Sequence, residues 1–112
     1  MLSSRYRFHR RNHVNRVYKT GKSVRKGALS LKYRVAPNGD QVKFAVVVSK
    51  KVAKSAVDRN RIRRRVFEVV RKLIDDVPAG FEGVIGVFDI SVKDLPAKEL
   101  EKHVRDLLAK AR

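Results

Sequence analysis

Residues 49–71, SKKVAKSAVDRNRIRRRVFEVVR, place a dense run of cations before and along an amphipathic pattern. From about Val57 to Asp76, apolar residues recur every three or four positions, which is the period of one helix face. The predicted inward stripe is Ile62, Val66, Val69, Val70 and Leu73. This helix is therefore expected to cover a sheet with one face and to carry arginine over much of the rest.

Strand patterns lie on both sides of this helix. Leu29 to Val35 alternates apolar and polar residues, as a half-buried strand does. Residues 37–40, PNGD, are a strong turn signal, so a strand from about Val42 to Ser49 is expected to return antiparallel. Its near-continuous apolar run predicts a central position covered on both faces. Val84 to Ile90 predicts a further buried strand.

Two more helices complete the pattern. Asn12 can cap a short first helix that ends near Gly21, and Pro96 opens a final helix. The inward positions of the final helix are Leu100, Val104, Leu107 and Leu108. No repeat or long linker divides the chain. The sequence predicts one α+β domain over residues 1–112, in the order α-β-β-β-α-β-α.

The charge of the chain is large and unevenly distributed. The formal net charge is +17. Residues 1–72 hold 22 Lys and Arg against three acidic residues, a net of +19, whereas residues 73–112 hold six against eight, a net of −2. A polyanionic partner, with nucleic acid as the leading candidate, is expected to bind the N-terminal two-thirds.

The densest cationic run is the segment from Lys50 to Arg65, with eight cations and one acid, Asp58. A solvated helix face is the alternative interpretation of such a run. However, arginines at the start of a helix oppose its dipole unless an anion binds there, and the guanidinium fork suits phosphate. We therefore interpret the run as a phosphate-binding surface. Asp58 is expected to be the N-cap of the helix rather than a catalytic acid.

Several classes of protein are disfavoured by what the chain contains. It has no cysteine, which excludes disulfides and thiolate zinc sites. His9, His13 and His103 lie far apart without obvious carboxylate partners, so neither protein-only catalysis nor a metal site of protein ligands is expected. A bound polyanion could still share magnesium ions with the protein. The longest aliphatic run, residues 45–48, is too short to span a membrane, and we expect a soluble cytoplasmic protein without a stable homo-oligomer.

The stretch at residues 49–71 closely resembles the signature of the ribonuclease P protein subunit, with paired lysines, a loop, and Arg59-Asn60-Arg61 opening a basic helix. Residues 12–24, NHVNRVYKTGKSV, resemble the first helix of that family and its following glycine. The resemblance implies a left-handed βαβ crossover, similar to the fourth domain of elongation factor G and to a small-subunit ribosomal protein domain. It also implies that a catalytic RNA cleaves precursor tRNA with magnesium, while the protein supplies affinity and substrate discrimination.

The same resemblance implies two groups of site residues. The catalytic RNA is expected to bind Lys50, Lys51, Lys54, Arg59, Asn60, Arg61, Arg63 and Arg64. The 5′ leader of precursor tRNA is expected to bind a groove formed by Val14, Tyr18, Ser30, Lys32 and Arg34, although Tyr18 could equally be a packing residue. Where the family commonly has a basic residue after its last strand, this chain has Phe88-Asp89-Ile90.

Two other functions fit a basic chain of this kind. A ribosomal or ribosome-associated RNA-binding protein would have a similar composition but no part in cleavage. A helix-turn-helix DNA regulator is less well supported, because residues 59–65 offer phosphate contacts all around the helix instead of one base-reading face.

Overall fold

The computed structural model describes residues 17–19, 21–36 and 41–111. A helical turn at residues 17–19 comes first. It is followed by β1 (Lys22–Lys26), β2 (Leu29–Val35), β3 (Lys43–Val48), α2 (Ala56–Leu73), η2 (Ile74–Asp76), β4 (Phe81–Val87), η3 (Ile90–Lys93) and α3 (Ala97–Lys110). The structure confirms the predicted α+β class and the order of the main elements.

The four strands form one sheet in the order β1-β2-β4-β3. β2 is antiparallel to both β1 and β4, whereas β3 runs parallel to β4. The strand after residues 37–40 therefore runs antiparallel to β2, as predicted, but β4 lies between the two. The predicted central position of this strand is wrong, because β3 is an edge strand. Phe44, Val46 and Val48 are buried, whereas Val47 is 40% exposed on the opposite face.

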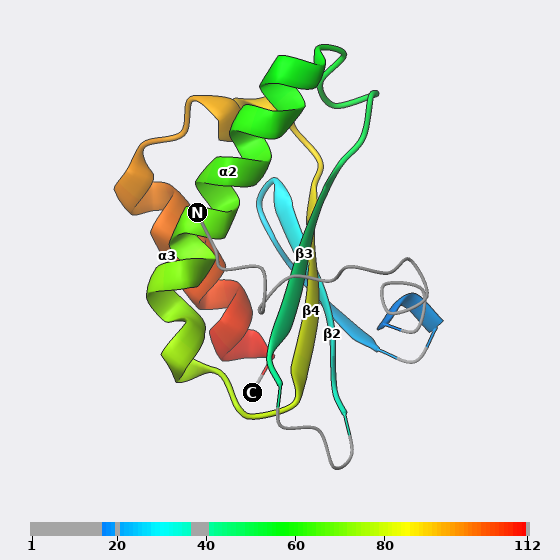
Figure 1. Cartoon of the computed structure of the whole chain (residues 1–112). Helices are drawn as coiled ribbons and strands as arrows, with labels where there is room; N and C mark the ends of the chain where they lie inside the picture. The colour runs from blue at the N-terminus through cyan, green and yellow to red at the C-terminus, as the bar shows by residue number, and fades with distance from the viewer. Residues whose placement is uncertain (1–16, 20, 37–40, 112) are drawn as a thin grey trace.

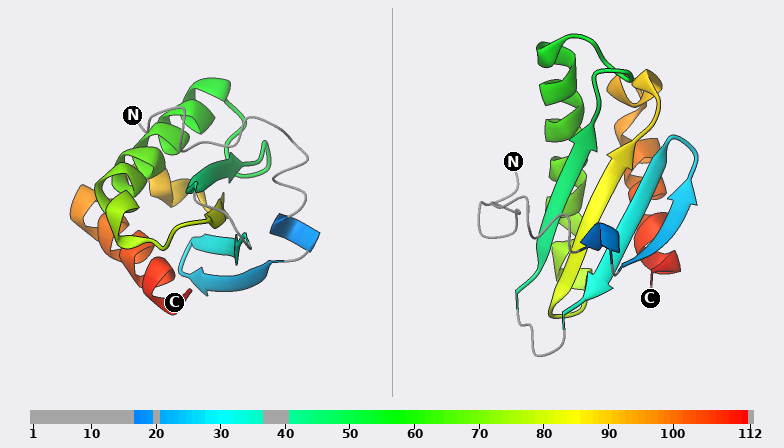
Figure 2. Two further views of the ribbon diagram at one scale, coloured as in Figure 1. Left: turned by 60° about the horizontal axis from the view of Figure 1, so that its bottom comes forward. Right: turned by 90° about the vertical axis from the view of Figure 1, so that its right-hand side faces the viewer.

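The connection from β3 through α2 to β4 has an uncommon hand. In the right-hand view of Figure 2 both strands run upward, the helices lie behind the sheet, and the chain moves from β3 on the left to β4 on the right. That path is a left-handed crossover, whereas nearly all parallel connections are right-handed. The expectation drawn from the family resemblance is confirmed.

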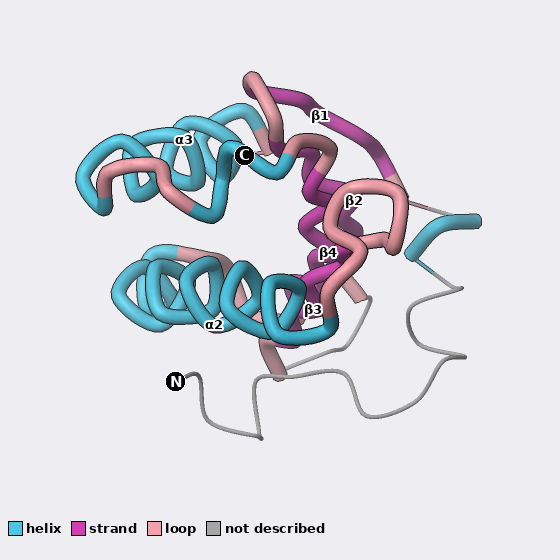
Figure 3. The backbone as a smooth tube through the Cα atoms, turned by 90° about the horizontal axis from the view of Figure 1, so that it is seen from above, coloured by secondary structure: helices cyan, strands magenta, loops and turns pink. Residues whose placement is uncertain are grey.

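Helices α2 and α3 cover one face of the sheet, and the core lies between these two layers (Figures 1 and 3). The five predicted stripe residues of α2 are buried, together with Phe67. The four predicted inward residues of α3 are buried as well. Full burial of each such side chain stabilises the fold by roughly 1.5–3 kcal/mol, so this layer holds the sheet and helices in one unit.

Two predictions about the ends of elements are wrong. Helix α2 begins after Ser55, which makes no side-chain cap, while Asp58 lies in the first turn and pairs with Lys93 at 3.1 Å. An acid in the first turn still complements the helix dipole. The last strand ends at Val87 rather than at Ile90, which leaves Phe88 beyond the sheet. Within the described residues, no helix is long and apolar enough to cross a membrane.

Candidate nucleic-acid interface

The face of the sheet opposite the helices carries a groove. Leu29 and Leu31 of β2 point into the core, so the alternating residues Ser30 and Lys32 point to the opposite face. The helical turn at residues 17–19 lies over this same face (Figure 2). Together they enclose a groove of about 290 Å³, hereafter the sheet-face groove. It is lined by Tyr18, Ser30, Lys32, Val47, Ser49, Val52, Val84, Gly86, Val87 and Phe88.

An aromatic ring and a cation meet at one side of this groove. The Nζ atom of Lys32 lies 4.6 Å from the centroid of the Tyr18 ring, and Tyr18 is 43% exposed. Burial raises the pKa of the Tyr18 phenol above its ordinary value, so the phenol stays neutral. A ring beside an ammonium group can stack a base and attract its phosphate, which is how single-stranded nucleic acid is commonly bound.

Three of the five residues predicted for the leader line the groove, and two do not. Tyr18, Ser30 and Lys32 are brought together. Arg34 shares their face but pairs with Glu82 of β4, with its Nε atom 3.4 Å from the carboxylate oxygen. Both side chains are less than one-fifth exposed, so this ion pair holds Arg34 against the sheet. Val14 lies outside the described residues.

A glycine sets the position of the helical turn. The Gly21 amide donates to the Val17 carbonyl at 2.8 Å. A Cβ atom at Gly21 would lie 2.5 Å from the Val17 oxygen and 2.6 Å from the Tyr33 oxygen, both of them backbone atoms. Only glycine permits this close approach, which places Tyr18 over the sheet.

The loop after β3 joins the sheet-face groove to the predicted RNA-binding run. Ser49 and Val52 line the groove, and Lys50 and Lys51 between them are exposed. The amides of Val52 and Ala53 both donate to the Ser49 carbonyl, which turns the chain sharply at this point. The two groups of predicted site residues are therefore continuous through this turn.

The predicted RNA-binding residues of α2 differ in their contacts. Arg61 and Arg64 are exposed, and no hydrogen bond or ion pair joins either to another described residue. Arg63 donates to the Asn60 side chain on the same helix face. Arg59 instead donates to the carbonyls of Ala53 and Lys54, at 2.9 and 2.8 Å, and so braces the loop that carries Lys50, Lys51 and Lys54.

Arg65 belongs to the cationic run but points elsewhere. Its guanidinium donates to the carbonyls of Val92 and Lys93, at 2.6 and 2.7 Å, and also to the carbonyl of Leu95. The helix pattern contains a signal for this inward role. Arg65 lies three residues after Ile62 and four before Val69, both of which are buried, so it lies along the edge of the apolar stripe.

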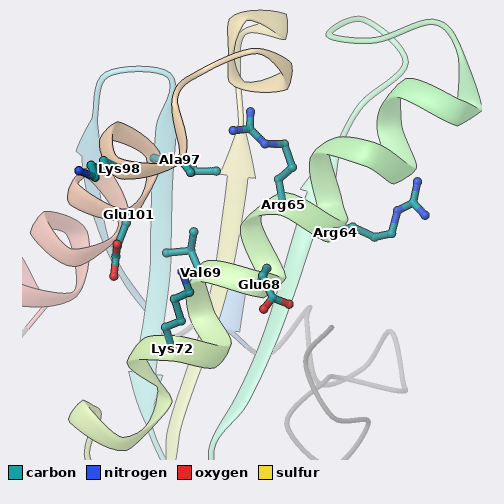
Figure 4. Close-up of a pocket in the computed structure, with 9 residues that line it drawn as sticks. Arg64, Arg65, Glu68, Val69, Lys72, Ala97, Lys98 and Glu101 are labelled. Carbon is teal, nitrogen blue, oxygen red and sulfur yellow. The ribbon is translucent and has the colours of Figure 1, made fainter.

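A second hollow, of about 620 Å³, lies between α2 and α3 (Figure 4). Its walls carry both signs of charge, from Arg64, Glu68 and Lys72 of α2 and from Lys98 and Glu101 of α3. Hydrogen bonding from Arg71 lowers the pKa of Glu68 to about 2, so this carboxylate stays ionised. A hollow lined by both signs of charge suits a polyanion less well than the sheet-face groove does.

Metal-binding chemistry is not supported by the described part of the chain. Among residues 17–19, 21–36 and 41–111, no three His, Asp or Glu side chains gather closely enough to hold a metal ion. His103, the one histidine in those ranges, lies on α3 beside Gly27, away from the sheet-face groove. His9 and His13 fall outside the described residues.

Comparisons with known proteins agree with this geometry. The Ribonuclease P family model matches residues 2–112. A ribonuclease P protein component from a Pseudanabaena species is 35% identical over 112 residues, covering 100% of this chain and 96% of its own length. One from Clostridioides difficile is 34% identical over 94 residues, covering 83% and 80%. The ribonuclease P protein of Thermotoga maritima has the same fold, with a TM-score of 0.82, 22% identity, and coverage of 95% and 97%.

The family model spans nearly the whole chain. The relatives from Pseudanabaena and Clostridioides difficile are similar enough, over enough of the chain, to show common family membership. A structure from Staphylococcus aureus also superposes with a TM-score of 0.79, at 23% identity over 96% of this chain and 95% of its own. The chain therefore belongs to the ribonuclease P protein family, and it is a protein component of that endoribonuclease complex.

Proposed function

We propose that this chain binds the catalytic RNA of ribonuclease P and the 5′ leader of precursor tRNA, and thereby assists removal of the leader. The observation that carries the proposal is the Tyr18–Lys32 pair in a groove that continues directly into the exposed cations of the loop and of α2. The groove fits a single strand, because it offers an aromatic ring beside an ammonium group and an apolar floor. The exposed arginines fit the phosphates of a folded RNA.

Bond breaking is assigned to the RNA, and the magnesium ions are assigned mainly to the RNA as well. The cations of this chain act by neutralising phosphates where the two RNAs approach each other, which lowers the concentration of magnesium needed to offset their repulsion. Arg61 and Arg64 are well placed for this role, since both are exposed at the first turns of α2. Such a mechanism requires no general acid or base from the protein.

A reconstitution assay tests this function. Purified protein is added to a bacterial ribonuclease P RNA and precursor tRNA at a magnesium concentration too low for the RNA alone. We expect cleavage to be restored at the mature 5′ end, and protein with Arg61 and Arg64 both changed to Ala to restore much less. No restoration by the unaltered chain at any protein concentration would overturn the proposal.

The ribosomal alternative is not favoured. The matching family model and the relatives described above are all ribonuclease P proteins. The DNA-regulator alternative is also weakened, because α2 is the crossover helix between β3 and β4 rather than the second helix of a helix-turn-helix unit.

A further inference from the structure

Phe88 is an exposed aromatic residue at the rim of the sheet-face groove. It follows β4 directly, lines the groove, and is 53% exposed. Its amide donates to the Ala28 carbonyl at 2.8 Å, which ties the residue to the turn between β1 and β2. The backbone therefore holds this ring at the groove in a fixed place, without burying it in the core.

A cation lies over the Phe88 ring. The Arg25 guanidinium is 4.6 Å from the ring centroid, and Arg25 is not part of the groove lining. A cation–π contact of this kind restricts the ring without filling the groove. Gly86 keeps the space beside the ring open, because a Cβ atom there would lie 2.9 Å from the Ser30 hydroxyl and 3.7 Å from the ring.

The groove thus has two similar contacts. Tyr18 has Lys32 at 4.6 Å, and Phe88 has Arg25 at 4.6 Å. Two rings, each beside a cation, line one groove of about 290 Å³. Rings that present their faces to successive bases, with cations for the phosphates between them, are the usual construction of a single-strand binding groove.

We propose that Phe88, held by Arg25, stacks on one nucleobase of the precursor tRNA leader, as a contact additional to Tyr18. The inference rests on the proposed function and deepens it by naming a base contact. A basic residue at this position would bind a leader phosphate and would be indifferent to the presence of a base. The ring of Phe88 makes this contact depend on the base itself.

Abasic substitution in the leader tests the proposal directly. Precursor tRNAs with a single abasic nucleotide at each leader position are bound to the complex of the full-length protein with a ribonuclease P RNA. For the unaltered protein, we expect loss of the base that stacks on Phe88, at a leader position separate from the one that stacks on Tyr18, to weaken binding by roughly fivefold or more. With Phe88→Ala, binding of the intact leader should weaken similarly, and removal of that base should then have little further effect.

Two further variants separate stacking from simple apolar contact. Phe88→Trp should retain tight binding of the intact leader, whereas Phe88→Leu should bind it as weakly as Phe88→Ala does. Ile90→Ala is the matched control, because Ile90 is 46% exposed nearby but does not line the groove, and it should leave leader binding unchanged. Leucine binding as tightly as phenylalanine, or additive losses from Phe88→Ala and every abasic position, would overturn the stacking assignment.

Failure of this inference is distinguishable from failure of the proposed function. The unaltered complex is first compared on precursor and mature tRNA. A preference for the precursor that persists in Phe88→Ala, together with additive abasic losses, would refute the role of Phe88 while leaving leader binding intact. An absence of any preference in the unaltered complex would instead refute leader binding as a whole.

Discussion

The guanidinium of Arg65 lies within 2.6 Å of the Val92 carbonyl oxygen and joins helix α2 to the segment that leads into α3. Its neighbour Arg64 contacts no other described residue by hydrogen bond or ion pair. In Figure 4 the Arg64 side chain points away from α3, whereas Arg65 points toward the segment after β4. Two adjacent arginines thus differ in their contacts, because Arg65 joins two parts of the fold while Arg64 is exposed and has no such partner among the described residues.

Changing Arg65 to Ala should lower the free energy of unfolding by about 2 kcal/mol, because it removes charge-assisted donors from three backbone carbonyls that are partly buried. Arg65→Lys should recover little, since one ammonium group cannot replace the planar fork. Urea denaturation measures both effects. Weakened RNA binding by Arg65→Ala with no loss of stability would contradict this assignment.

Changing Arg61 or Arg64 to Ala should weaken RNA binding while leaving stability nearly unchanged, which is the reverse of the effect expected for Arg65→Ala. Stability should change by no more than about 0.5 kcal/mol, as is usual for exposed positions. Binding of the ribonuclease P RNA should weaken, and the slope of log affinity against log salt should fall by roughly one for each phosphate that the variant no longer neutralises. Arg105→Ala is the control, because Arg105 is 64% exposed on α3, outside the basic run, and should leave the slope unchanged. Unchanged slopes in both test variants would mean that these arginines do not bind RNA.

Periodicity is sufficient to predict the helices but not the pairing of the strands. The stripe from Ile62 to Leu73 specifies which face of α2 is buried whatever that face packs against. Strand order depends on contacts between distant segments, and nothing in residues 42–49 indicates that β4 inserts beside them. The apolar run predicted a strand covered by other elements on both faces. Its outward residue Val47 instead forms part of the floor of the sheet-face groove.

The sequence predicts which region carries the site residues, but it does not predict the contacts of each residue. The alternation in β2 places Ser30, Lys32 and Arg34 on one face, and the structure agrees. The ion pair of Arg34 depends on Glu82, which is 48 residues later in the chain, so no local pattern reveals it. The sequence marks Phe88 only as a departure from the family. Its exposure could not be predicted, because that exposure depends on β4 ending at Val87.

Changing Tyr18 to Ala should weaken binding of leader-bearing precursor by about 1–3 kcal/mol, the range for loss of one base–aromatic stack, and should leave mature tRNA unaffected. Tyr18→Phe, which keeps the ring, should bind normally. Tyrosine is neutral below its pKa, and burial raises that pKa, so the contribution of Tyr18 should stay constant between about pH 6 and 9. Equal losses on both substrates would show that the ring only packs against the sheet.

Changing Gly21 to Ala should abolish the preference for precursor over mature tRNA while leaving the helix–sheet core folded. The new Cβ would clash with the Val17 and Tyr33 carbonyl oxygens, and since both are backbone atoms, the helical turn must move away from β2. The wall of the groove that carries Tyr18 would then be lost. Binding of the two substrates by the reconstituted complex measures the preference, and circular dichroism monitors the core.

Gly27→Ala provides the matched control for this change. Gly27 has a φ of +57°, so alanine there should cost about 1 kcal/mol of stability through backbone strain, yet its Cβ would meet only the His103 ring at 3.6 Å. This variant should therefore be destabilised but keep the preference for precursor. If Gly21→Ala also kept that preference, the helical turn could not be a wall of the leader-binding groove, because the clash leaves the turn no way to stay where the structure places it.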